Sequence, residues 1–346
     1  MTAPTVTVIV LNHNGMTFLK GCFDSLLAAT YPDTELLMVD NGSTDDSVAF
    51  VEQNYQTVTV IHSGGNIGYS AANNLGVKRA SGEYVVLLNN DVEVTPGWLE
   101  PLVAEFESDP SIVACQPKLL HMHNRKSFEY AGAAGGFMDR LGYPYLRGRV
   151  FTTIEADLGQ YDTSVDLFWA SGAALAIRKE AFIAAGGLDE AFVHHMEEID
   201  LCWRLHLQGY RLRVRPDSVV YHYAGGTIKP DSFRKTYWNH RNSVFMLIKN
   251  YSSTRLLWVL PSRFLLDIAL VLKSFMVLDL KRVVAVIVAY GWLAFHLFLI
   301  CRKRREVQHQ READDEVIDA TMHPTSLVFS YYIRGWKTYR EIAGEA

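Results

Sequence analysis

Three polar segments near the start of the chain have residue types that could bind a nucleotide. VIVLNHNG places Asn12 and Asn14 after an apolar run, and LLMVDNGSTDDS ends a second apolar run at Asp40. The Asp40 carboxylate could accept a hydrogen bond from the ring N–H of uracil or thymine, and Gly42 would let the following loop turn tightly. Taken alone, an Asp in this position is also a common helix cap.

The third segment is a glycine-rich run, GGNIGYSAANNLG at 64–76, which contains Asn66, Gly68 and Asn73. It leads into a predicted helix, and the N-terminus of a helix is a natural place for phosphate. The spacing GxGxxG is absent, so the run gives little support to a dinucleotide site.

A fourth segment, YVVLLNNDVEV, is an apolar strand pattern that stops at Asn89, Asn90 and Asp91. In open α/β sheets, ligands bind at the carboxyl ends of the strands. A carboxylate beside amide oxygens suits a hard divalent cation such as Mn²⁺ or Mg²⁺, and the cation in turn can hold a diphosphate. Alone, the same residues would equally suit a polar turn after a core strand.

Two further segments could carry acid–base or metal chemistry. HHMEEIDLCWRLHLQGY contains Glu197, Glu198 and Asp200 within four residues. Their mutual repulsion could raise the pKa of one of them and suit it to proton abstraction, although acids are also favoured in any first helical turn. His222 lies just past another apolar run, where a histidine is either a metal ligand or structural.

The elements that must position these residues alternate in type. The sequence predicts strands at Thr5–Leu11, Glu35–Val39, Thr57–Ile61 and Tyr84–Leu88 and helices at Phe18–Ala29, Asp45–Gln53 and Ser70–Arg79. This alternation predicts βαβ units and a parallel sheet. Residues 121–170 are less regular and predict loops over a cleft, and strand and helix patterns return between 172 and 220.

The composition changes after about residue 255. LLWVLPSRFLLDIALVLKSFMVL is apolar, yet its few polar residues fall on nearly one side of a helix, which suggests a helix lying in a membrane interface. These residues are Arg263, Asp267, Ser274 and Lys281. The uncharged run 283–301, with basic residues on both flanks, is at the short end of what spans a bilayer. The alternative is a helical pair that packs on the preceding domain or on a second copy.

Composition narrows the class of protein. The 346 residues carry a formal net charge of -5, which argues against a nucleic-acid binder. The four cysteines are scattered without CxxC spacing, so neither a zinc site nor a disulfide framework is indicated. The N-terminus lacks the pattern of a signal peptide, and we expect the domain to be cytosolic.

The order of these motifs resembles that of the family 2 glycosyltransferases. VxVIVLNxN, VDNGSTDDS, NxGxxxANN, LLNNDVEV, SGAALAIRKEAF, EEIDLCWRLxxxGY and VYHxxGGT occur in sequence across roughly residues 5–250. The pattern is most similar to the rhamnosyltransferase-like branch that builds cell-surface polysaccharide. The resemblance implies a GT-A fold, which is an α/β domain with a mostly parallel sheet flanked by helices. It also implies metal-dependent transfer from a nucleotide-diphosphate sugar with inversion at the anomeric carbon.

The resemblance also implies roles for individual residues. Asp40 matches the base-contacting Asp, and Asn14 matches the polar residue after the first strand. Asn89 to Asp91 match the DxD-type motif, with Asp91 as metal ligand and Asn89 in place of the first Asp. His222 matches a late metal-ligating His, and Ser171 and Gly172 match the loop between donor and acceptor. Glu198 stands where the family usually has a catalytic Asp, and Glu197 and Asp200 remain candidates for the base.

The expected organisation is a GT-A domain at 1–250 and a helical membrane-association region with a charged tail at 251–346. We expect the nucleotide-diphosphate sugar, dTDP-rhamnose or a UDP-sugar, to be the donor and a lipid-linked or other glycan to be the acceptor. The expected location is the cytoplasmic face of the bacterial inner membrane, with a homodimer as an alternative use of the apolar helices. A sugar-nucleotide pyrophosphorylase would need a GxGTRL-type loop, and a processive synthase would need QxxRW, and neither occurs. A catalytically inert nucleotide-sugar-binding scaffold is the remaining rival.

Overall fold

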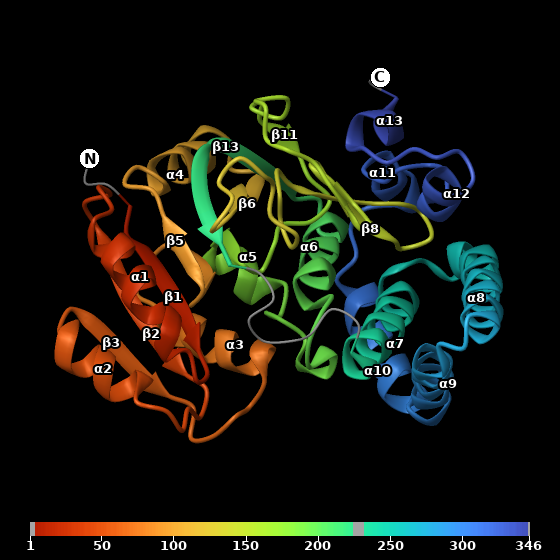
Figure 1. The fold of residues 1–346 in the computed structure, drawn as a ribbon, viewed down its shortest axis with the longest axis horizontal. Helices are drawn as coiled ribbons and strands as arrows, with labels where there is room; N and C mark the ends of the chain where they lie inside the picture. The colour runs from red at the N-terminus through yellow and green to blue at the C-terminus, as the bar shows by residue number, and fades with distance from the viewer. Residues whose placement is uncertain (1–3, 224–231, 345–346) are drawn as a thin grey trace.

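The fold is built on a mixed nine-stranded sheet flanked by helices (Figure 1). The structure is a computed structural model, and it describes residues 4–223 and 232–344. One half of the sheet is parallel and contains β1 (Val6–Asn12), β2 (Thr34–Asp40), β3 (Val58–His62) and β4 (Tyr84–Asn89). The other half contains β5 (Val92–Val94), β6 (Ile112–His121), β11 (Val165–Asp166), β12 (Ala174–Arg178) and β13 (Arg211–His222). β12 runs antiparallel between β4 and β6, so the expected mostly parallel sheet is mixed.

Helices cover both faces of this sheet and bury its apolar side chains in two clusters. They are α1 (Met16–Leu27), α2 (Ser47–Asn54), α3 (Tyr69–Arg79), α4 (Leu99–Ser108), α5 (Lys179–Ala184) and α6 (Glu197–Leu207), with a short 3-10 turn at Glu190–Phe192. The four strands and three helices predicted from local pattern are all present, with ends that differ by at most two residues. Such patterns are reliable here because strands covered on both faces are nearly continuous apolar runs.

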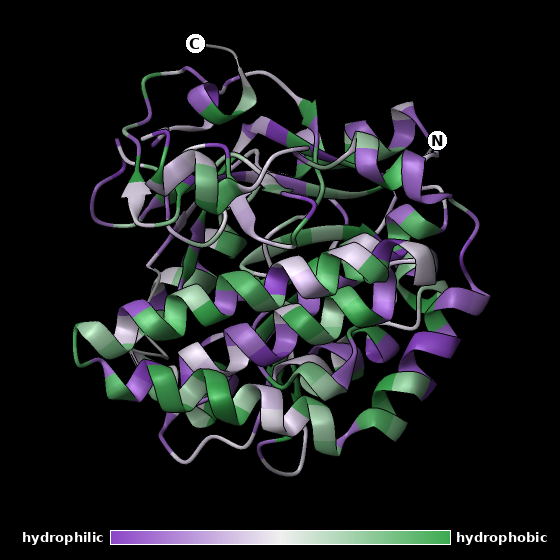
Figure 2. Ribbon diagram, turned by 90° about the vertical axis from the view of Figure 1, so that its right-hand side faces the viewer, coloured by the Kyte–Doolittle hydropathy of each residue, from purple (hydrophilic) through white to green (hydrophobic). Residues whose placement is uncertain are grey.

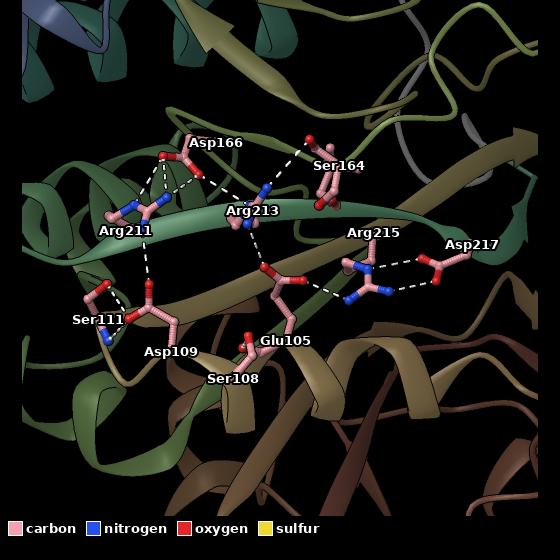
Figure 3. A network of polar contacts seen from close by, with 11 residues as sticks. Glu105, Ser108, Asp109, Ser111, Ser164, Asp166, Arg211, Arg213, Arg215 and Asp217 are labelled. Atoms are coloured by element: carbon pink, nitrogen blue, oxygen red, sulfur yellow. Dashed lines mark hydrogen bonds and ion pairs between the residues drawn. The ribbon is translucent and has the colours of Figure 1, made fainter.

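The long strand β13 is fastened to its surroundings by arginines that alternate along it (Figure 3). Side chains two residues apart on a strand share one face. Arg213 and Arg215 both contact Glu105 of α4, at 2.9 and 2.7 Å, and Arg211 contacts Asp109 and Asp166. These ion pairs hold α4 against β13, whose far end carries His222.

Residues 121–170 form more than loops. They contain a second, four-stranded sheet made of β7 (Gly136–Met138), β8 (Pro144–Leu146), β9 (Arg149–Val150) and β10 (Thr153–Ile154). The C-terminal helices α11 (Asp315–Ala320), α12 (Leu327–Tyr332) and α13 (Tyr339–Ala343) pack on this sheet. Asp139 joins the two parts, because its carboxylate accepts a hydrogen bond from Leu327 N at 2.7 Å.

Four helices follow the sheet: α7 (Phe233–Asn250), α8 (Ser253–Met276), α9 (Leu280–Phe295) and α10 (Leu297–His309). α7 is the central one and contacts α6, α8, α9 and α10. Its Lys249 is buried and binds Asp189 and Asp200 at 2.7 and 2.8 Å. α7 therefore connects the sheet-bearing part of the molecule to the later helices.

The polar stripe predicted on α8 faces the rest of the protein. Four residues of α8 are buried, namely Val259 and the polar Arg263, Asp267 and Ser274. Arg263 donates to Ser243 Oγ of α7, and Asp267 accepts from Tyr290 Oη of α9 at 2.7 Å. Lys281, the fourth member of the predicted stripe, is exposed beyond the turn.

The predicted span 283–301 is divided between two helices. α9 ends at Phe295, and α10 departs from its direction by 73°. Among the described residues, no single helix combines the length and the apolar character that crossing a bilayer requires, and only α9 and α10 taken together reach them.

Candidate functional site

The parallel half of the sheet brings the predicted polar residues to one edge. In the strand register Asn12 lies opposite Asp40, and Leu11 lies opposite Asn89. Because all three strands run in the same direction, their polar carboxyl ends form a continuous row. The predicted first, second and fourth segments are therefore neighbours.

Asn12 and Asn14 organise this row. Asn12 is fully buried, donates to Ser47 Oγ at 2.9 Å and accepts from Asn90 Nδ2 at 2.8 Å. Asn14 has a φ of 52°, and its side-chain oxygen accepts from Thr44 N at 2.7 Å. Both asparagines thus hold the loops around the row, and both the nitrogen and the oxygen of the Asn12 amide are engaged by the protein itself.

Asp40 and the loop after it lie at the β2 end of this polar row. Asp40 Oδ1 accepts from Ser43 N at 3.1 Å, and Oδ2 lies 3.8 Å from His62 Nδ1. Gly42 has a φ of +76°, and a Cβ there would come within 2.6 Å of Asn66 N, so glycine is required at this close approach. Asn66 Oδ1 accepts from Gly68 N at 3.1 Å, which fixes the turn that enters α3.

The first turn of α3 faces the same region. Gly68 precedes the helix with a φ of +87°. Asn73 is buried and donates to Tyr69 O at 3.1 Å, while its Oδ1 has no hydrogen-bond partner within the described chain. Tyr69 Oη donates to Gly172 O at 2.9 Å, which joins α3 to the loop before β12.

Asp91 and His222 come together because of strand pairing. Asp91 directly precedes β5, whose Val92 lies opposite His222 in β13. Asp91 Oδ1 is 3.1 Å from His222 Nε2, and both side chains are buried. The GGT residues at 225–227, which follow His222 in the sequence, lie outside the described residues.

Glu129 is a third member of this group that sequence reasoning missed. It is fully buried, it accepts from Ala131 N and Gly132 N, and its Oε1 lies 3.3 Å from His222 Nδ1. Burial alone would lower the pKa of His222, but the Glu129 and Asp91 carboxylates outweigh burial and raise this pKa to about 10. The imidazole thus lies between two acids.

This donor set fits a divalent cation that is shared with a ligand. The described residues contain no group of three or more His, Cys, Asp or Glu arranged to hold a metal. Asp91 and His222 offer one carboxylate and one imidazole, and a carboxylate behind the imidazole is the usual second partner of a metal-binding His. Mg²⁺ and similar cations are commonly held by one or two protein groups together with substrate phosphates.

The segment Ser171 to Ala173 lies between the metal-binding candidates and the acidic helix α6. Asn89 N donates to Ala173 O at 3.1 Å, and Ser171 N donates to Gln116 Oε1 at 2.8 Å. A Cβ on Gly172 would lie 2.7 Å from Tyr69 Oη and 3.7 Å from Glu198 Cβ. Glycine at 172 therefore allows the close approach of the Tyr69 hydroxyl.

The three acids of α6 occupy different surroundings. Asp200 is fully buried and accepts from Arg204, Lys249 and Asn250. Glu197 is buried as well, whereas Glu198 is partly exposed as a residue although its Oε2 atom is buried. Because Asp200 is saturated by internal partners, Glu198 and Glu197 are the acids able to meet a ligand.

Burial gives Glu198 the properties of a base near neutral pH. It raises the pKa of Glu198 to about 7. Burial and the adjacent Glu198 charge raise the pKa of Glu197 well above its usual value, so Glu197 holds its proton more tightly. The Oε2 atom of Glu198 has no hydrogen-bond partner in the described part of the chain, which leaves it able to accept one.

The loop before α6 is held in an unusual conformation by α7. Val193, His195 and Met196 have φ values of 67°, 67° and 73°. Asn242 of α7 holds this loop through its side-chain amide. Its Nδ2 donates to the carbonyl oxygens of Phe192, His194 and His195 at 2.9, 2.7 and 2.8 Å. Residues other than glycine keep a positive φ only where surrounding contacts fix the backbone. Only the three-dimensional contacts reveal Asn242 as part of the site.

Comparisons with known proteins agree with this geometry. The family model described as Glycosyl transferase family 2 matches residues 7–169. The O-antigen biosynthesis protein RfbC of Myxococcus xanthus is 31% identical over 243 residues, which are 68% of this chain but 18% of that protein. An N-acetylglucosaminyl-diphospho-decaprenol L-rhamnosyltransferase of Mycobacterium tuberculosis is 26% identical over 285 residues, covering 77% of this chain and 91% of the relative. These matches confirm the resemblance found in the motifs.

Solved structures with related folds were obtained with nucleotides and metal. GalNAc-T7 with UDP, GalNAc and Mn²⁺ aligns with a TM-score of 0.56 and 20% identity over 71% of this chain and 48% of its own. The mannosyltransferase PcManGT from Pyrobaculum calidifontis, in complex with GDP-Man and Mn²⁺, aligns with a TM-score of 0.51 and 17% identity over 92% and 86%. At these identities the likeness shows the GT-A-like fold.

Proposed function

Because the chain carries a family 2 glycosyltransferase domain, we propose that it transfers a sugar from a nucleotide diphosphate to a hydroxyl group with inversion at the anomeric carbon. The observation that carries this proposal is the approach of Asp91 to His222 at the sheet edge that also holds Asp40. The Asp91 carboxylate, the His222 imidazole and the polar strand ends at Asn12 and Asp40 thus lie along one edge of the sheet. The transfer is proposed to be non-processive.

The donor side is assigned to the parallel strands. Asp40 and the Gly42–Asn66 turn are proposed to receive the base, and the first turn of α3 the phosphates, as helix N-termini favour anions. Mn²⁺ or Mg²⁺ would be held by Asp91 and His222 and would neutralise charge on the departing diphosphate. Glu129 would keep the His222 ring oriented with Nε2 toward Asp91.

The acceptor side is assigned to Glu198. Its carboxylate takes the proton from the acceptor hydroxyl, and the hydroxyl oxygen attacks the anomeric carbon from the face opposite the diphosphate. No protein nucleophile is needed for a single displacement. The two substrates are proposed to meet beside the backbone of Gly172, where a Cβ would lie 3.7 Å from Glu198 Cβ.

A nucleotide-diphosphate sugar as donor, dTDP-rhamnose or a UDP-sugar, and a lipid-linked glycan as acceptor complete the proposal. The support comes from the mycobacterial relative, whose name describes rhamnosyl transfer to a decaprenol-linked sugar. This chain covers 91% of the length of that relative. The proposed role is in cell-surface polysaccharide synthesis at the cytoplasmic face of the bacterial inner membrane.

The first test is a screen of nucleotide sugars for metal-dependent thermal stabilisation, since a bound ligand raises the melting temperature by mass action. The proposal expects a dTDP- or UDP-sugar to stabilise the protein with Mn²⁺ and much less with EDTA. The second test measures release of the nucleoside diphosphate. Binding without any turnover would favour the inert scaffold, and stabilisation by none of the nucleotide sugars would overturn the proposal.

A further inference from the structure

The side of the molecule formed by α8 and α9 exposes large apolar side chains. Figure 2 looks onto this side, where hydrophobic residues prevail along the helices. The turn between the helices is the most apolar part, whereas turns on a protein surface are ordinarily polar. The exposed residues at and near this turn are Leu272, Phe275, Met276, Val277, Leu278 and Leu280.

α8 is arranged with its polar side inward. Arg263 and Asp267 are 3% and 2% exposed and bind groups of α7 and α9, while Leu265 and Met276 on the outer side are 65% and 81% exposed. Water around the molecule would favour the opposite orientation, since burying apolar area is the main gain in folding. The inward polar contacts are specific, so the outward apolar face is a fixed feature of the fold.

Basic side chains flank the apolar turn. Lys273 and Lys281 are exposed, and neither forms an ion pair with any residue that the structure describes. Asp279, the one acid of the turn, caps α9 by accepting from Arg282 N and lies 3.4 Å from the Arg282 guanidinium. An apolar surface bordered by uncompensated positive charge is complementary to an anionic lipid bilayer.

We propose that the α8–α9 hairpin inserts its apolar turn into the surface of a bilayer that contains anionic lipids, with Lys273 and Lys281 at the headgroups. The helices lie along the interface with their polar side on α7. This surface goes beyond the proposed transfer reaction, and its argument uses none of the residues assigned to donor, metal or acceptor. A second copy that docked through the same patch would bury the same apolar area, but the acid of that patch, Asp279, already pairs with Arg282.

The test uses the full chain and lipid vesicles, because removing the helices would also remove the α9 and α10 contacts that cover α7. The probe is cosedimentation with phosphatidylcholine vesicles with and without phosphatidylglycerol. The informative variant combines Phe275→Glu and Leu278→Glu, whose side chains are 60% and 78% exposed, so folding should be unaffected. The matched control is Leu158→Glu, which alters an 85% exposed leucine in the loop between β10 and β11.

The expected result is binding of the unaltered chain to anionic vesicles and a loss of about ten-fold or more in the double variant, since two charges would enter the interface. Leu158→Glu should bind like the unaltered chain. Replacing Lys273 and Lys281 by Glu should lower binding to anionic vesicles, as high salt should. Unchanged melting temperature would show that each variant is folded.

Three outcomes would overturn the inference. One is an unaltered chain that stays in the supernatant with both kinds of vesicle. Another is an equal loss of binding in Leu158→Glu. The third is a dimer in solution that the double variant converts to a monomer without any vesicle binding, which would make the face a homodimer interface. Release of nucleoside diphosphate, measured without vesicles, reports separately on the proposed transferase, so either proposal can fail alone.

Discussion

Asp91 Oδ1 lies 3.1 Å from His222 Nε2, although 131 positions separate the two residues in the sequence. The pairing of β5 with β13 creates this contact, and Glu129 supports it from behind. Among the described residues, Asp91 and His222 supply a cation with only two protein ligands. In the proposed site the diphosphate of the nucleotide-sugar donor supplies further ligands.

We therefore predict that Mn²⁺ binds much more tightly when a nucleoside diphosphate is present. Without phosphate oxygens the cation has only Asp91 and His222, which is a weak protein site. Titration of the protein with Mn²⁺, followed by electron paramagnetic resonance with and without UDP or dTDP, measures the difference. Asp91→Ala and His222→Ala should each remove the nucleotide-dependent binding, and tight Mn²⁺ binding to either variant would contradict the assignment.

Glu198 and its neighbour Glu197 form a matched pair for testing the catalytic base. Glu198→Gln should lower turnover by about 10²-fold or more, because general base catalysis contributes roughly that much. Glu197→Gln should retain most of the activity, because burial and the adjacent Glu198 charge raise the pKa of Glu197 and disfavour its deprotonated form. Both variants should bind the nucleotide normally. Greater loss in Glu197→Gln than in Glu198→Gln would transfer the role to Glu197.

The pH dependence of the reaction should report the same group. Burial raises the pKa of Glu198 to about 7, and the base is active only when deprotonated. Plots of kcat/KM should therefore fall about ten-fold per unit below pH 7 and level off above it. A profile that stays flat down to pH 5 would mean that a carboxylate with an ordinary pKa performs the step.

Asn242 should act as a positioning residue for the start of α6. Asn242→Ala removes three hydrogen bonds to loop carbonyls and should let Val193, His195 and Met196 leave their left-handed conformations. We expect kcat to fall about ten-fold or more while the KM for the donor is unchanged, because the donor-binding row is elsewhere. An equal loss in donor affinity would indicate a general structural defect.

Lys249 should be important for stability and not for chemistry. Lys249→Met leaves Asp189 and Asp200 buried with fewer partners, and breaking such a pair costs about 3 kcal/mol in free energy of unfolding. The control is Lys20→Met, which removes an exposed pair with Asp24 and should cost under about 1 kcal/mol. Denaturant unfolding measures both, and similar losses would argue against a buried network.

The sequence predicted the parallel half of the sheet well, because each βα unit there is local and its apolar pattern is continuous. It did not predict that β12 would lie antiparallel between β4 and β6, since that pairing joins segments far apart in the chain. The approach of His222 to Asp91 came from family resemblance alone. Glu129 carried no signal, because it lies in an irregular segment and becomes informative only through its distance to His222.

The orientation of α8 shows a different limit. Spacing alone placed Arg263, Asp267 and Ser274 on one side of a helix, and the structure agrees. The same spacing does not show whether the polar side faces solvent or protein. Helical periodicity reveals only that one side of the helix is more polar than the other. The partners that decide it, Ser243 and Tyr290, lie on other helices.

Asp139 of the small sheet depends on residues that follow it by almost two hundred positions. Its carboxylate caps α12 through Leu327 N, and Tyr339 packs on Tyr145. During synthesis the small sheet must therefore wait, with part of its surface bare, until residues near 327–343 have left the ribosome. Until then this surface of the nascent chain is open to non-native contacts. We therefore expect chaperones that bind nascent chains to be most important at this stage of synthesis.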